Sequence, residues 1–187
     1  MVASRNQTLD DGDYARLSRQ GDRVAFSELV RRYQDRIYRF VMRMVRSRED
    51  ALDLTQETFV RAWQALPQWR PEAAINTWLF QIARNLAIDH LRRRKSVQFV
   101  SDDAAGIDLP QERPGPEAQA QTAQQYRLLE AALQQIAPVH REIMLLREVE
   151  GLSYDEIAQV LAINPGTVKS RIARARHALL ARMQRHE

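Results

Sequence analysis

The chain has 187 residues, of which 44% are hydrophobic and 28% charged, as in a globular protein of one or two domains. It has no cysteine, which excludes a disulfide framework, a zinc–thiolate site, an iron–sulfur cluster and a cysteine nucleophile. Residues 1–10 lack the apolar core of a signal peptide, and no apolar run approaches the ~20 residues that span a bilayer. We therefore expect a cytoplasmic protein that does not insert into a membrane.

Charge is distributed unevenly along the chain. Residues 1–100 carry 18 basic and 12 acidic side chains, residues 101–120 carry 1 and 5, and residues 121–187 carry 9 and 7. Two basic blocks around an acidic one indicate two modules that face a polyanion and are joined by a linker. Nearly all of the 28 basic residues are arginine, whose planar fork suits phosphate recognition, although codon bias in a GC-rich genome accounts for most of the excess.

The N-terminal half has apolar residues at helical spacing throughout and no alternating, strand-like run. We expect a disordered tail over residues 1–12 and a short helix over residues 13–20. Asp22 is a suitable cap for a long helix that carries one apolar stripe to Val45.

A third and a fourth helix are expected further along this half. In the third, over residues 50–66, Leu52 is expected to face the core and Leu54 to face outward. Pro67 ends this helix. Thr77 is expected to cap the fourth helix, which runs to about residue 95.

Residues 96–116 interrupt the helical pattern with prolines, glycines and acidic side chains. This composition buries too little surface to offset chain entropy, so it predicts a flexible linker. Helical periodicity resumes over residues 117–187. The fold class expected is therefore all-α, with two small helical domains, over residues 13–95 and 117–187, joined by this linker.

The C-terminal domain contains a helix-turn-helix pattern. Ser153 and Glu156 form a capping box, and Ala158 lies ten residues before Val168, the spacing usual for this motif. The turn position often held by glycine is Ala162 here. The last helix then carries an apolar stripe opposite a basic face, which suits entry into the major groove of DNA. In isolation, such a face is more often only solvated.

These motifs resemble the extracytoplasmic-function (ECF) sigma factors of bacterial RNA polymerase, in the sigma-70 family. The segments that carry the resemblance are Glu148–Arg176, Asp50–Phe59, Thr77–Asn85 and the basic run over residues 92–95. Together they cover nearly the whole chain, in the order that the family has. The resemblance implies a region 2 domain that docks on the polymerase and opens the −10 element, and a region 4 domain that reads the −35 element.

The resemblance also implies the partners and the residues that meet them. The partners are the RNA polymerase core (β and β′ subunits), promoter DNA and an anti-sigma factor. The residues expected to bind the core polymerase are Asp53, Leu54, Gln56, Glu57 and Arg61. Those expected at the −10 element are Trp69, Arg70, Asn76, Arg84, Asn85, Arg92, Arg93 and Arg94. Those expected at the −35 element are Pro165, Gly166, Thr167, Lys169, Ser170, Arg171, Arg174 and Arg176.

Some of these assignments have plainer alternatives. Trp69 suits stacking on a flipped base, worth about 1–3 kcal/mol per base, but could equally be a core residue, as we expect of Trp78. The acidic face of the third helix could be an ordinary solvated face. The chain as a whole could be a stand-alone helix-turn-helix regulator, or a nucleic-acid-processing enzyme that carries this motif. The enzyme alternative is weak, since the four histidines are scattered and no metal, cofactor or nucleophile motif is present.

Overall fold

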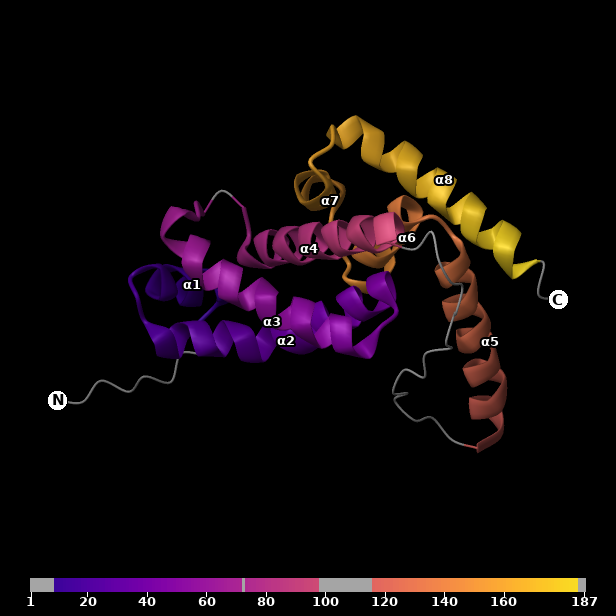
Figure 1. The fold of residues 1–187 in the computed structure, drawn as a ribbon, viewed down its shortest axis with the longest axis horizontal. Helices are drawn as coiled ribbons and strands as arrows, with labels where there is room; N and C mark the ends of the chain where they lie inside the picture. The colour runs from indigo at the N-terminus through magenta and orange to yellow at the C-terminus, as the bar shows by residue number, and fades with distance from the viewer. Residues whose placement is uncertain (1–8, 72, 98–115, 185–187) are drawn as a thin grey trace.

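The computed structural model describes residues 9–71, 73–97 and 116–184, and every regular element in these ranges is helical (Figure 1). Most of the expected tail and linker lies outside the described residues. The elements of the first domain are α1 (Asp11–Arg19), α2 (Arg23–Val45), α3 (Arg48–Ala65), the short 3-10 helix η1 (Leu66–Gln68) and α4 (Ile75–Val97). Those of the second domain are α5 (Pro116–Gln135), α6 (Pro138–Met144), the π-helical turn η2 (Leu145–Val149), α7 (Tyr154–Leu161) and α8 (Pro165–Met183).

Side-chain caps fix where the helices of the first domain begin. The Asp22 carboxylate accepts the backbone N–H groups of Val24 and Ala25 at the start of α2, as the sequence predicts. At the start of α1, Asp10 forms a capping box with Asp13, so this helix begins at Asp11, inside the stretch expected to be a disordered tail.

The start of α4 differs from the prediction. The helix begins at Ile75, and Thr77, expected to be its cap, is buried inside its first turn. The Thr77 hydroxyl donates instead to Glu156 Oε1 of α7, 3.1 Å away. Thr77 therefore links the two domains rather than capping a helix.

The core of the first domain lies where α2, α3 and α4 meet. Ile37 and Phe40 of α2 are fully buried, and the ring of Phe40 meets that of Phe80 from α4 edge-on, with centroids 5.5 Å apart. This stripe is the one that the apolar spacing of α2 predicts. Arg46 ends α2 in the left-handed conformation, with φ 63°.

The second domain packs directly on the first. In Figure 1, α4 lies between the pair α2 and α3 and the helices α7 and α8. Contacts join α6 to α2 and α7 to α4, while α8 packs on α5, α6 and α7. The buried apolar residues of both domains form one continuous cluster. We call this packing of α5–α8 on α2 and α4 the closed arrangement. Of the helices described, none is both long and apolar enough to cross a membrane.

Candidate nucleic-acid and partner interfaces

The helix-turn-helix is formed by α7 and α8. The backbone N–H of Glu156 donates to Ser153 Oγ (3.3 Å), and the N–H of Ser153 donates to Glu156 Oε2 (2.8 Å). This reciprocal pair confirms the predicted capping box at the start of α7. Ala162 ends α7 in the left-handed region, with φ 51°. Glycine is favoured in this conformation. Ala162 adopts it here, so the turn has the left-handed geometry without a glycine.

α8 begins just after this turn. The Asn164 side chain accepts the N–H of Gly166 (2.8 Å), and Pro165 occupies the first helical position, where its missing N–H costs nothing. Val168 and Ile172 are buried on the side of α8 that packs on the other helices of the domain. This packing determines which side of α8 faces outward.

The outward side of α8 carries most of the residues predicted for the −35 element. Pro165, Gly166, Lys169, Ser170, Arg174 and Arg176 are exposed, and Thr167 and Arg171 are half-buried at its edges. Arg174 Nε donates to the Ser170 carbonyl (3.3 Å), and Arg176 donates to Glu148 Oε1 (2.6 Å). The structure therefore brings this predicted set together on one largely exposed face of α8.

The predicted core-binding residues lie on α3, but not all on its surface. Asp53, Gln56 and Arg61 are exposed, and Glu57 accepts from Arg61 Nε (2.6 Å). Leu54, however, is only 9% exposed and belongs to the core, which corrects the prediction that it faces outward. The exposed leucine is Leu52, at 52%.

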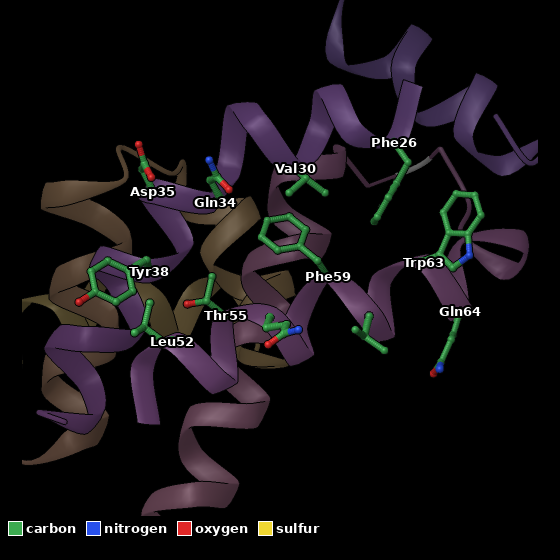
Figure 2. Close-up of a pocket in the computed structure, with 12 residues that line it drawn as sticks. Phe26, Val30, Gln34, Asp35, Tyr38, Leu52, Thr55, Phe59, Trp63 and Gln64 are labelled. Atoms are coloured by element: carbon green, nitrogen blue, oxygen red, sulfur yellow. The ribbon is translucent and has the colours of Figure 1, made fainter. Parts of the chain in front are cut away.

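Leu52 lines a groove between α2 and α3 with a volume of about 790 Å³ (Figure 2). The ring of Phe26 from α2 lies 5.0 Å from that of Trp63 from α3 at one end, and Tyr38 and Leu52 lie at the other. Between them, Val60 is also exposed. Apolar side chains that remain open to solvent in a groove between two helices mark a surface for binding another protein. This groove is not predicted from the sequence, because the apolar spacing of the helix places Leu52 in the core.

The residues predicted for the −10 element divide into buried and exposed groups. Trp69 is only 5% exposed and packs near Trp78, with ring centroids 6.5 Å apart. It therefore presents no free face for stacking, which favours the core interpretation. Trp78, expected in the core, is half-buried. Arg70 is exposed and Asn76 is half-buried beside Thr77.

The rest of this set follows α4. Asn85, Arg92, Arg93 and Arg94 are exposed along it. Arg84 instead faces the second domain, where its Nε and Nη2 donate to Glu142 Oε2 and Oε1 at 2.8 and 3.2 Å. The structure thus separates Arg84 from the exposed basic end of α4. Among the described residues, no cluster of three or more histidine or acidic side chains could hold a metal ion.

Comparison with known proteins identifies the family. Residues 29–97 match the family model of Sigma-70 region 2, and residues 126–179 match that of Sigma-70, region 4. The chain is 33% identical to the ECF RNA polymerase sigma-E factor of Haemophilus influenzae, over 95% of the chain and 97% of that protein. It is 36% identical to the RNA polymerase sigma-H factor of Pseudomonas aeruginosa, over 86% of each. It is 37% identical to the ECF RNA polymerase sigma factor SigE of Mycolicibacterium smegmatis, over 89% of the chain and 65% of that protein.

Solved structures give the same result. CnrH, in complex with the cytosolic domain of CnrY, superposes with a TM-score of 0.71 at 26% identity, covering 95% of this chain and 99% of CnrH. The sigma factor RpoE of Bartonella quintana, in complex with the anti-sigma factor NepR, shows the same fold with a TM-score of 0.69 at 24% identity, over 85% of this chain and 96% of RpoE. With both sigma-70 regions present in order and relatives matched along nearly their whole length, this chain belongs to the ECF sigma factors of RNA polymerase, a family of transcription initiation factors.

Proposed function

We propose that this chain directs the RNA polymerase core to promoters by reading the −35 element with α8 and opening the −10 element with α4 and the loop over residues 67–76. The observation that carries the proposal is the outward face of α8, where Lys169, Ser170 and Arg174 are exposed at the start of a helix-turn-helix recognition helix. In such motifs the first turns reach base edges in the major groove. The chain needs no catalytic group for this role, and it acts in the cytoplasm, where the polymerase is.

For the −10 element, the proposal relies on the exposed side chains of α4 and of the loop before it. Arg92, Arg93 and Arg94 supply positive charge for the phosphate backbone, and Asn85 supplies an amide. Trp78 is half-buried, whereas Trp69 is 5% exposed, so Trp78 replaces Trp69 as the aromatic side chain proposed for stacking.

For the polymerase core, we assign the groove between α2 and α3 together with the exposed residues of α3. The groove contributes apolar area at Leu52 and Val60, and Asp53 and Gln56 add polar groups at its margin. An apolar centre with a polar rim is the usual anatomy of a protein interface. An anti-sigma factor is the further partner proposed, supported by the likeness in fold to RpoE of Bartonella quintana, which was solved with the anti-sigma factor NepR.

Transcription in vitro with core polymerase tests this function. The chain should support initiation from a promoter library randomised at −35 and −10, and should enrich a defined pair of elements. A chain that binds the library DNA but never yields transcripts with the core would be a stand-alone regulator instead. Transcription that core polymerase gives equally without the chain would also refute the proposal.

A matched pair of variants tests the groove. Leu52→Arg should weaken core binding at least about tenfold, because it places a charge in the apolar centre of the interface, where single residues carry much of the affinity. Val24→Arg is the control, since Val24 is 81% exposed on α2 and does not line the groove. The free energy of unfolding of both variants should lie within about 0.5 kcal/mol of the wild-type value, as is usual for surface substitutions. Equal core affinity for the two variants would refute the assignment.

A further inference from the structure

Within the described residues, the two domains are joined by three ion pairs of the same polarity, with Arg36, Arg43 and Arg84 as the cations. Arg36 and Arg43 of α2 pair with Glu150 and Glu130, with Nε to carboxylate oxygen distances of 3.0 and 2.8 Å. Arg84 of α4 makes the third pair, with Glu142. In each pair the first domain supplies the arginine and the second domain supplies the glutamate. The second domain therefore presents carboxylates to the arginines of a domain that otherwise faces a polyanion.

These pairs are deeply enclosed on the carboxylate side. Glu142 is 1% exposed, and the side chain of Glu150 is 3% exposed. Arg84 holds both oxygens of Glu142, which is the bidentate geometry that guanidinium also adopts on phosphate. In the closed arrangement, Glu142 thus occupies the donors that Arg84 would offer to a phosphate.

Arg141, beside Glu142, adds a contact of a different kind. Its Nη1 donates to the carbonyl of Met44 at the end of α2 (3.0 Å), while its Nε donates to Leu133 (2.9 Å) at the end of α5. Both carbonyls lie at the negative ends of helix dipoles, which stabilise a buried cation. This side chain connects the last turn of α2 to the second domain.

The closed arrangement cannot read a whole promoter. The −10 and −35 elements lie about 25 base pairs apart, which is about 85 Å of duplex at 3.4 Å per base pair. A domain of about 70 residues has a radius of gyration of only about 11 Å, so α8 stays within a few tens of ångströms of α4 while the domains touch. The domains must separate before both elements are bound.

We propose that the closed arrangement is an autoinhibited state of the free protein, in which Glu142 acts as an internal substitute for DNA phosphate and keeps Arg84 from the −10 element. This inference rests on the proposed function. The inhibition is selective, because the exposed face of α8 stays open while Arg84 is paired.

The pairs are suited to a reversible closure. Burying a carboxylate removes its hydration, and this loss offsets much of the attraction to its arginine. Burial raises the pKa of Glu150 despite its contact with Arg36, which is the sign of that loss. The contacts therefore hold the domains together only until polymerase and promoter DNA supply competing partners.

The experiment uses the full chain and two readouts. Small-angle scattering of the free protein measures compaction, and the wild type should lie near the ~16 Å expected of a compact chain of this length. Transcription with limiting core polymerase then gives the concentration of the chain at half-saturation. Glu142→Gln should expand the free protein. If it shifts the closed-to-open ratio from about 10:1 to 1:1, the concentration of the chain at half-saturation should fall about fivefold. The reason is that apparent affinity scales with the open fraction.

Glu28→Gln is the matched control. Glu28 also pairs with arginines, Arg31 and Arg32, but all three lie on α2, so this variant should match the wild type in both readouts. Arg84→Gln should expand the protein like Glu142→Gln, and the double variant should expand it no further, since one pair is being broken. Circular dichroism verifies folding, and Glu150→Gln serves in place of Glu142→Gln if that variant unfolds.

The outcomes separate this inference from the proposed function. Equal compaction of the wild type, Glu142→Gln and Glu150→Gln would show that these ion pairs do not hold the domains closed, which would overturn the proposal. Expansion without a lower half-saturation would overturn the inhibition. Absence of transcription from every variant, the wild type included, would instead refute the proposed function, and the scattering result would still decide whether the pairs close the molecule.

Discussion

Replacing Ala162 with glycine should stabilise the protein, although it removes a methyl group. Ala162 ends α7 with φ 51° and ψ 49°, and its N–H donates to the carbonyl of Gln159. This left-handed conformation costs a residue with a side chain about 1–2 kcal/mol, because its Cβ approaches the following carbonyl oxygen. Glycine has no Cβ and adopts the same backbone without this cost.

An opposing term reduces the gain. Glycine leaves the unfolded chain freer, which lowers stability by about 0.4–1 kcal/mol. The net expectation for Ala162→Gly is a gain of about 0.5–1 kcal/mol. For a chain of this length that unfolds as one unit, this corresponds to a rise in Tm of about 1–4 °C.

Thermal unfolding followed by circular dichroism measures this change. The control is Ala173→Gly, at an exposed position in the middle of α8. There the backbone is right-handed, and glycine should cost about 0.5–1 kcal/mol. The two substitutions are chemically identical and should have opposite signs. A fall in Tm for Ala162→Gly comparable to that of the control would show that the turn is not left-handed at this residue.

Three further predictions concern the second domain. Val168→Asp buries a carboxylate in the core under α8 and should destabilise the domain by about 3 kcal/mol or more; a Tm equal to that of the wild type would contradict its burial. Arg171→Ala or Arg174→Ala should each relax discrimination at one −35 position, a loss of about 1–3 kcal/mol, whereas Arg182→Ala should not; identical preferences in a randomised −35 library would show that the reading face is wrong. Because burial raises the pKa of Glu150 above its ordinary 4.5, the folded protein holds this proton more tightly, and the contribution of Glu150 to stability should fall as pH rises from 4.5 through the raised value. Urea unfolding of the wild type and Glu150→Gln across this window measures the difference, and a difference that grows in favour of the wild type with rising pH would contradict it.

The helix-turn-helix was predictable from sequence because its signals are local. The capping box needs only Ser153 and Glu156, three residues apart, and the turn needs only Asn164 and Pro165 before α8. Each of these contacts forms within one turn of helix. The side of α8 that faces outward then follows from the helical period, and the exposure of Lys169 agrees with it.

The orientation of α3 could not be predicted in the same way. Its inward face is formed largely by small or polar residues, with Ala51, Thr58 and Ala62 fully buried where α2 and α4 approach. The spacing of large apolar side chains gives these residues little weight, and it therefore predicts Leu52 and Leu54 on the wrong sides of the helix. The hydroxyl of Thr58 donates to the Leu54 carbonyl within the helix, so the buried Thr58 side chain has a hydrogen-bond partner.

The contacts between the domains had no signal in the sequence at all. Arg84 and Glu142 are 58 residues apart, and Arg36 and Glu150 are 114 apart. A charged side chain on a helix is ordinarily solvated, and nothing near Glu142 in the sequence marks it as buried. Only the three-dimensional arrangement shows that these side chains meet.

The position of the groove sets an order of events for assembly. Leu52 and Val60 remain exposed in the closed arrangement, and α3 packs mainly on α2, α4 and η1. On the proposed assignment of this groove to the polymerase, capture does not have to wait for a rare open molecule. In rapid-mixing experiments, domain separation should follow binding as a first-order step whose rate levels off at high polymerase concentration, the kinetic signature of induced fit. With this order of events, the free protein would stay compact until the polymerase is bound.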